Sequence, residues 1–331
     1  VLPTLAKALA TLPALAAALL EEDVPDREIA GVIAAELGAL TRRAAIIAEA
    51  EAEAQGHGKP PCAYALLTLG SAGRGESLLA LDQDNAIVFA TGEPDGPEDR
   101  WFAALGARIA QILADVGVPL CPGGVMASNP AFRGSLAQWR KRIGHWLSRA
   151  DPKDLLAVDI VFDLRPVHGD LAMAENLWRE AWAAAASNRA FLRLLADADS
   201  HRAAPFGLFG RLRTEDGRVD MKASALAPLV AGGRLLALLH ATPARATAER
   251  YEAALAAKAG GEPDLRRAIL VQGRALDLIL RSQLADITAG RRPSNRVPLE
   301  IAEAQGGVDL LKDDLHRVQD LEELVRNQLS R

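Results

Sequence analysis

The stretch LTLGSAGRGESLLALDQDNAIVF, residues 67–89, decides the fold class of this chain. It joins two short apolar runs, 64–69 and 85–90, through a glycine-rich turn and a pair of aspartates. Apolar runs of this length between turn residues are typical of strands that are covered on both faces. The stretch therefore predicts two buried strands with a polar connection between them.

The glycine-rich turn has the composition of a phosphate-binding loop. Gly70 and the glycines after it allow backbone N–H groups to approach an anion without a side-chain clash. Ser71 adds a hydroxyl donor, and Arg74 adds a planar cation that suits phosphate oxygens, with a bracing role in the loop as the alternative. The Gly-Lys-Ser/Thr ending of the P-loop is absent, so the turn belongs to another class of nucleotide site.

The two aspartates after the turn predict a metal site. We expect Asp82 and Asp84 at the start of the second strand, where side chains two residues apart point to the same side. Two carboxylates that converge in this way can hold one hard cation, Mg²⁺ or Mn²⁺. A phosphate-binding turn beside such a cation is what transfer from a nucleoside triphosphate requires. Glu76 is expected in the first turn of a following helix, where an acid favours the helix dipole.

Helix and strand patterns alternate after this stretch. Helices are predicted over 98–116 and 135–148, and the Pro-, Gly- and Asn-rich segment 119–134 predicts a loop with one short strand. The run AVDIVFD, residues 157–163, predicts a third strand. Interleaved signals of this kind indicate an α/β or α+β domain.

The remainder of the chain has helical periodicity. Residues 1–56 predict a helical hairpin, and after residue 169 only helical patterns remain outside the Gly- and Pro-containing segment 203–222. Four C-terminal helices are predicted, over 226–240, 247–258, 264–287 and 308–329. We therefore divide the chain into an N-terminal helical segment, a mixed domain and a C-terminal helical domain, with bounds 1–60, 61–190 and 191–331.

Composition excludes several classes of protein. The net charge of −5 argues against a nucleic-acid-coating protein, which would carry a basic excess. Cys62 and Cys121 are too few for a disulfide framework, which favours the reducing cytoplasm. No stretch reaches the roughly 18 uninterrupted apolar residues that span a bilayer, so no membrane span is expected. Because the chain begins with Val1 and not Met, we expect an upstream part to precede it.

Gly70-Ser71, ten residues and then Asp82-x-Asp84 resemble the signature of the polymerase-β-type nucleotidyltransferase superfamily. The longer stretch is similar to one branch, the nucleotidyltransferases found downstream of cyclic-nucleotide-binding and CBS domains in bacterial signal-transduction proteins, relatives of protein-PII uridylyltransferase. Further segments resemble this branch: FDLRPVHGD at 162–170, PFGLFG at 205–210, VDMK at 219–222 and GRRPSN at 290–295. The resemblance runs from about residue 30 to the end.

The resemblance implies a third carboxylate, on a strand antiparallel to the Asp-x-Asp strand. Its place in the family segment favours Asp163, with a salt bridge to Arg165 as the alternative. Asp159 lies four residues earlier, and an even offset on a strand keeps the same face, so spacing leaves Asp159 open as the third acid. Lys222 is a candidate for binding base, ribose or phosphate, and a surface ion pair is its alternative.

Together these observations predict an α+β, polymerase-β-like nucleotidyltransferase domain with a mixed sheet, N-terminal helices and a C-terminal helical, substrate-binding bundle. The expected reaction moves a nucleoside monophosphate from an NTP to a hydroxyl acceptor, with a protein as one candidate acceptor. The expected metal ligands are Asp82, Asp84 and Asp163, and the expected nucleotide-binding residues are Gly70, Ser71, Arg74 and Lys222. A non-catalytic nucleotide-binding module and a template-free RNA nucleotidyltransferase are the alternatives, and a homodimer is compatible with the sequence.

Overall fold

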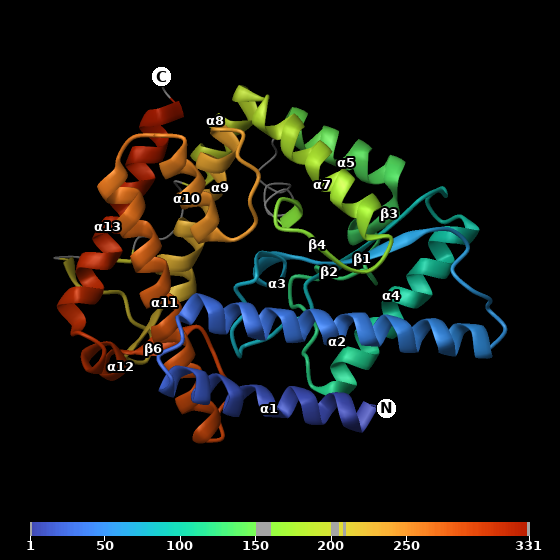
Figure 1. The fold of residues 1–331 in the computed structure, drawn as a ribbon, viewed down its shortest axis with the longest axis horizontal. Coiled ribbons are helices and arrows are strands. Elements are labelled where there is room, and N and C mark those ends of the chain that lie inside the picture. Colours follow the sequence, from blue (N-terminus) through green and yellow to red (C-terminus); the bar gives the residue numbers. More distant parts are fainter. Residues whose placement is uncertain (1, 150–159, 200–204, 208–209, 330–331) are drawn as a thin grey trace. The chain divides into compact units, whose positions relative to one another are not determined.

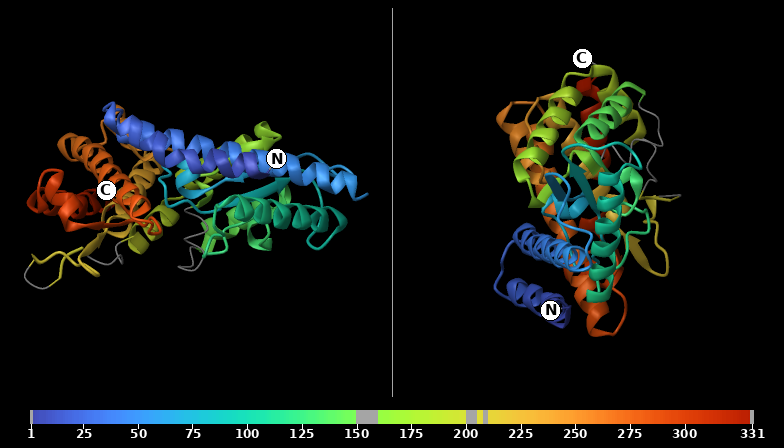
Figure 2. Two further views of the ribbon diagram at one scale, coloured as in Figure 1. Left: turned by 90° about the horizontal axis from the view of Figure 1, so that it is seen from below. Right: turned by 90° about the vertical axis from the view of Figure 1, so that its right-hand side faces the viewer.

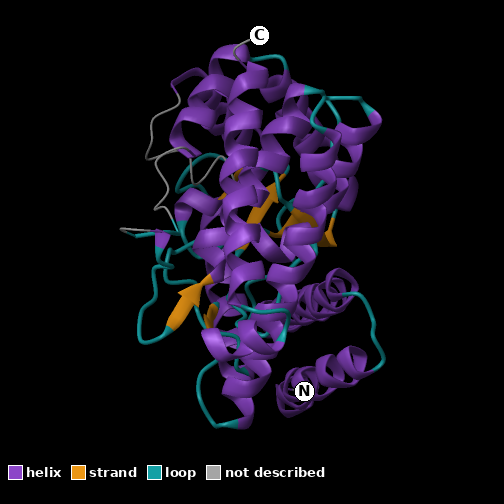
Figure 3. Ribbon diagram, turned by 90° about the vertical axis from the view of Figure 1, so that its left-hand side faces the viewer, coloured by secondary structure: helices purple, strands orange, loops and turns teal. Residues whose placement is uncertain are grey.

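The computed structural model describes residues 2–149, 160–199, 205–207 and 210–329 (Figure 1). The chain divides into two compact units. The first contains the residues up to Leu15, Gly31–Ser77 and Leu81–Ala181, and the second contains Ala16–Ala30, Leu78–Ala80 and the residues from Trp182 onward. Helices make up most of the described ribbon in both units (Figure 3).

The first unit is built on a four-stranded mixed sheet with the order β3-β2-β1-β4. Its strands are β1 Tyr64–Thr68, β2 Asn85–Phe89, β3 Arg133–Ser135 and β4 Arg165–Gly169. β1 pairs antiparallel with β2 and β4, and β2 pairs parallel with β3. The predicted α+β class is therefore confirmed, as are the strands expected at 64–69 and 85–90.

Every residue of β1 and β2 is buried, because helices cover both faces of these two central strands. On one face α2 Asp26–Ala54 and α4 Pro97–Val116 pack through a core that includes Leu40, Leu66, Ile87, Phe89 and Phe102. Figures 1 and 2 show α5 Leu136–Arg149 and α7 Leu171–Ala186 on the opposite face. The predicted helices 98–116 and 135–148 are thus confirmed as α4 and α5.

The strand predicted over 157–163 is wrong for the described part of that range. Residues 160–161 are helical and 162–163 form a turn, while 157–159 lie outside the described residues. The strand starts later, at Arg165, and contains Pro166. Because β4 is an edge strand, it tolerates a proline that has no N–H to donate. The apolar run is instead buried, with Val161 and Phe162 in the interior.

The N-terminal region forms two helices, α1 Leu2–Glu21 and α2, separated at Asp23, whose φ is +55°. Within the part of the chain that the structure describes, two segments are long and apolar enough to cross a membrane by length and composition, Leu2–Glu21 and Lys222–Leu239. The second is 61% buried, as expected for a core helix, and the first, near the N-terminus, is 11% buried. Length and composition alone are weak grounds for a membrane span, since core helices and signal sequences have them too.

The second unit is mainly helical. Its main helices are α8 Arg189–Asp199, α9 Ala227–Leu239, α10 Thr247–Ala256, α11 Glu262–Thr288 and α13 Val308–Leu329, and the last four match the predicted C-terminal helices. Outside the segment 203–222 the expectation of helices alone is wrong at β6 Arg296–Pro298, which is followed by α12 Leu299–Ala304. β6 pairs antiparallel with β5 Arg218–Asp220, which lies within that segment. Three-residue strands are too short for an alternating pattern to reveal them.

Two carboxyl groups meet within the second unit, at the start of α2. The Asp26 side chain hydrogen-bonds to that of Asp277 of α11. Asp277 also accepts a hydrogen bond from Arg281, whose Nε lies 2.5 Å from Asp277 Oδ1. Burial, reinforced by the charge of Asp277, raises the pKa of Asp26 from 3.8 to about 6. The folded chain therefore holds a proton between about pH 4 and 6 that the unfolded chain has lost, so stability falls as the pH rises through this window.

We predict that Asp26→Asn stabilises the protein above pH 6 and has little effect at pH 4. Two pKa units correspond to about 3 kcal/mol, and solvent screening of this half-buried pair reduces the expected gain to about 1 kcal/mol. Urea unfolding at pH 4, 5, 6 and 7.5 measures the difference. Asp23→Asn, which removes an exposed carboxylate from the same loop, is the control. A stability gain that does not depend on pH would contradict the shared proton.

Candidate nucleotide and metal site

The glycine-rich turn follows β1 directly, as the sequence predicts. Residues Gly70–Arg74 form the short helix α3, and Gly75, with a φ of +76°, ends it by donating its N–H to the Ala72 carbonyl. Gly70 has a φ of +54°, a left-handed conformation that favours glycine. Ser71 is partly exposed, and its carbonyl accepts the Glu76 N–H at 2.8 Å. The turn is thus closed by its own backbone.

Asp84 lies against this turn. The Leu69 N–H donates to the Asp84 carbonyl at 3.0 Å, which continues the β1–β2 ladder one pair beyond Thr68 and Asn85. A Cβ atom placed on Gly70 would lie only 2.9 Å from Oδ2 of Asp84. The missing side chain at position 70 therefore gives the Asp84 carboxylate its place beside the turn.

Asp82 and Asp84 precede β2 and do not belong to it, which corrects the expected strand position. Gln83 between them is buried, and its side chain donates to the carbonyls of Ala110 at 3.1 Å and Val118 at 2.7 Å. Both aspartates are partly exposed. Gln83 points into the interior between two aspartates that are not buried. The shared side of Asp82 and Asp84, expected from their spacing on a strand, stays a prediction because neither residue belongs to β2.

The loop after α4 is fixed to the site by residues that the sequence analysis did not single out. The Asn85 side chain accepts the Ala127 N–H at 2.9 Å and donates to the Gln83 carbonyl at 3.1 Å. Burial, together with a hydrogen bond to Asp84, raises the pKa of the Cys121 thiol. The only sequence feature that points to Asn85 is its place directly after Asp84. Nothing in the sequence around Cys121 indicates that it lies near the site.

Arg74 connects two acidic side chains in the interior. Its Nη1 lies 2.6 Å from Oδ2 of Asp163, and its Nε lies 2.7 Å from Oε2 of Glu76. The three side chains are 13%, 1% and 8% exposed, respectively. Burial acts to lower the pKa of Arg74, but the charges of Asp163 and Glu76 outweigh it and raise this pKa above its usual range. Arg74 therefore braces the turn, which is one of the two roles predicted for it.

Asp163 also meets the turn through its backbone. A Cβ on Gly73 would lie 1.9 Å from the Asp163 carbonyl oxygen, so only glycine fits there. Arg165 donates from Nε to the Gly73 carbonyl at 2.9 Å. The structure thus brings Asp163 to the glycine turn across 89 residues of sequence, with its carboxylate bound to Arg74.

Two details of the expected third acid need correction. β4, which follows Asp163, runs parallel to β2, because both are antiparallel to β1; the expected antiparallel relation is wrong. Glu76 begins no helix, since residues 76–84 contain none, and it binds Arg74 instead. Asp159 lies outside the described residues. Lys222 is exposed at the start of a π-helical segment, Lys222–Leu226, in the second unit.

Whether the site suits a divalent cation depends on its donors. Among the described residues, no group of three His, Cys, Asp or Glu side chains is arranged to hold a metal ion. Mg²⁺ is commonly held by one or two carboxylates together with substrate phosphates and water. Asp82 and Asp84, two partly exposed carboxylates next to a glycine turn, have the donor chemistry that this arrangement uses.

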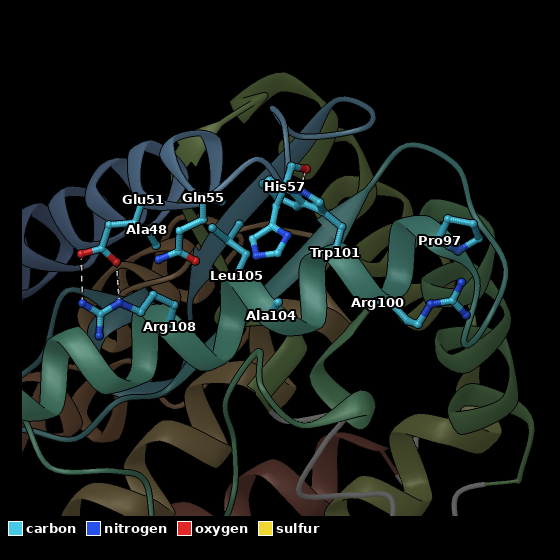
Figure 4. Close-up of a pocket in the computed structure, with 11 residues that line it drawn as sticks. Ala48, Glu51, Gln55, His57, Pro97, Arg100, Trp101, Ala104, Leu105 and Arg108 are labelled. Atoms are coloured by element: carbon cyan, nitrogen blue, oxygen red, sulfur yellow. Dashed lines mark hydrogen bonds and ion pairs between the residues drawn. The ribbon is translucent and has the colours of Figure 1, made fainter.

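A separate cavity of about 390 Å³ lies between the end of α2 and the start of α4 (Figure 4). Its lining includes Glu51, which is paired with Arg108, and the neighbouring rings of His57 and Trp101. None of the predicted site residues lines this cavity. It lies near the start of β1, whereas the glycine turn follows the end of that strand.

The α+β unit with its glycine turn and paired aspartates has the form of a nucleotidyltransferase domain. Residues 10–153 match the family described as "Putative nucleotidyltransferase DUF294", and residues 189–329 match "Putative nucleotidyltransferase substrate binding domain". The two matches together span most of the chain, which is therefore similar to nucleotidyltransferases of this kind in both its parts. Nucleotidyl transfer is thereby supported as its general activity. A search of curated proteins finds no match.

Removing the Arg74 cation should destabilise the protein strongly. We predict that Arg74→Met lowers the free energy of unfolding by about 3–5 kcal/mol, because two buried carboxylates each lose an ion pair with its guanidinium. Arg74→Lys keeps the charge and should cost less. Urea unfolding measures both, with Arg140→Met as the control, since the exposed pair of Arg140 and Glu180 is worth at most about 1 kcal/mol. Equal losses in Arg74→Met and Arg140→Met would contradict a buried charge cluster.

Proposed function

We propose that the protein transfers a nucleoside monophosphate from an NTP to a hydroxyl acceptor and releases pyrophosphate. In this proposal Asp82 and Asp84 hold Mg²⁺ or Mn²⁺, and Gly70, Ser71 and Arg74 bind the triphosphate. The observation that carries it is the packing of the Asp84 carboxylate on Gly70, where a Cβ would lie 2.9 Å from Oδ2. A carboxylate of the Asp-x-Asp pair and the glycine-rich turn meet there.

The chemistry requires positioning and charge neutralisation more than a protein nucleophile. The acceptor oxygen forms a bond to the α-phosphorus, the bond from that phosphorus to the bridging oxygen of the β-phosphate breaks, and pyrophosphate leaves with the electron pair. The hydroxyl proton passes to a nearby carboxylate or to water. A bound divalent cation supplies neutralisation of the phosphate charge. The backbone of the turn orients the phosphates, and Asp84 is held in place by the Leu69–Asp84 hydrogen bond.

The proposal also gives roles to Asp163 and Lys222. We propose Asp163 as the third metal ligand, which requires that its carboxylate exchange Arg74 for the cation, and Arg74 would then be available to the phosphates. Lys222 is proposed as a nucleotide contact from the helical unit, where its exposed ammonium is open to an anion.

A binding module without turnover is the second candidate. It is favoured by one observation, the buried ion pair of Asp163 with Arg74, because a site that never holds the third ligand would bind nucleotide without transferring it. Pyrophosphate release distinguishes transfer from binding alone.

For the biological setting we propose a cytoplasmic enzyme of signal transduction with an upstream CBS or cyclic-nucleotide-binding domain and a protein acceptor. The acidic net charge supports an acceptor other than nucleic acid.

The test uses labelled ATP, UTP, CTP and GTP with Mg²⁺ or Mn²⁺ and a native lysate as the source of acceptor. We predict that Asp82→Asn and Asp84→Asn each lower pyrophosphate release by about a hundredfold or more, since the developing charge loses its counter-charge. Asp115→Asn, which removes an exposed acid of the same unit, should retain the wild-type rate. Full activity in Asp84→Asn would show that the site is elsewhere. Nucleotide binding without pyrophosphate in the wild type would favour the binding module.

A further inference from the structure

Three residues between the glycine turn and Asp82 belong to the second unit. Leu78–Ala80 separate from the first unit after Ser77, and the chain returns to it at Leu81. Their backbone is held by Gln283 of α11, whose Oε1 accepts the N–H of Leu79 at 2.6 Å and that of Ala80 at 3.3 Å. Gln283 is fully buried. One glutamine of the helical unit therefore holds the segment that leads into the Asp82-x-Asp84 pair.

The orientation of the Gln283 amide is determined by its neighbours. Backbone N–H groups can only donate, so the oxygen of Gln283 must face Leu79 and Ala80. The Nε2 group then donates to Oδ1 of Asn295 at 3.3 Å. Asn295 is in turn fixed through its carbonyl, which accepts the Met221 N–H at 3.1 Å. Each amide in this chain of contacts has a defined direction.

These contacts join stretches that are far apart in the sequence. Met221 lies in the VDMK segment at 219–222, and Asn295 ends the GRRPSN segment at 290–295. Both converge on Gln283, and through it on residues 79 and 80. A single residue, Leu81, separates this anchored backbone from Asp82.

We infer that Gln283 and Asn295 are positioning residues for the Asp82-x-Asp84 carboxylates. The inference rests on the proposed function, and it assigns to the helical unit a second task besides substrate binding. An anchored backbone one residue before Asp82 restricts the carboxylate to few orientations before a cation arrives, so less ordering remains when the cation binds. Without the anchor, the buried N–H of Leu79 and the partly buried N–H of Ala80 lose this acceptor, and the segment must find other partners.

The experiment compares Gln283→Ala with Gln272→Ala in the full chain. Gln272 is a buried glutamine of the same helix α11, so its loss reports the general effect of truncating a buried amide there. Three readouts are taken: amide hydrogen exchange at Leu79 and Ala80, the dissociation constant for Mn²⁺ by electron paramagnetic resonance, and kcat and KM for the NTP. Residues that orient metal ligands typically contribute 10–100-fold to metal affinity or activity.

We expect Gln283→Ala to speed exchange at Leu79 and Ala80, to weaken Mn²⁺ binding about tenfold or more and to lower kcat by a similar factor. Gln272→Ala should leave all three near the wild type. Gln283→Glu, which retains the acceptor oxygens, should recover much of the loss, because the Asn295 amide can turn to donate to it. The effects of Asn295→Ala on exchange, Mn²⁺ affinity and kcat should lie between those of Gln283→Ala and Gln272→Ala. This variant provides the test if Gln283→Ala does not fold.

The two proposals fail in different ways. Wild-type protein that neither binds Mn²⁺ nor releases pyrophosphate contradicts the proposed function. Wild-type protein that does both, with Gln283→Ala and Asn295→Ala equal to Gln272→Ala in exchange, Mn²⁺ affinity and kcat, contradicts the positioning role alone.

Discussion

The site depends on the close approach of backbone to backbone and carboxylate at two glycines. Gly70 leaves the space that Oδ2 of Asp84 occupies, and Gly73 leaves the space that the Asp163 carbonyl occupies. Any side chain at position 73 would overlap a main-chain atom, which cannot move aside as the end of a flexible side chain can. These contacts bring the segment that precedes β2 and the segment that precedes β4 against the same turn. They depend on the shape of the backbone and not on charge.

Charge then stabilises what the glycines allow. One guanidinium, that of Arg74, lies between the carboxylates of Asp163 and Glu76 in the interior, where the low dielectric makes both the attraction and the cost of burial large. Asp82 and Asp84 place two further carboxylates nearby in the sequence. In the proposed function, Asp82 and Asp84 would hold the metal ion of a bound triphosphate, and the turn would bind its phosphates.

Much of the first unit follows from local pattern. The apolar runs of β1 and β2 and the apolar stripe of α4 lie where periodicity predicts them, because burial on both faces or on one stripe leaves a direct mark on the sequence. β4 is different, since an edge strand is partly exposed and contains Pro166 and His168, and its pattern is that of a loop. The run that does look like a strand contains Val161 and Phe162, which are buried around the turn before β4.

The sequence by itself determined the α+β class, the glycine turn and the spacing of Asp82 and Asp84, because each is a local property of consecutive residues. The tertiary structure decided which side chains those residues meet. That Arg74 binds Asp163, and that Gln283 accepts the N–H groups of Leu79 and Ala80, could not be read from spacing. Partners 89 and 204 residues apart are chosen by how helices and strands pack, and packing depends on the whole chain at once.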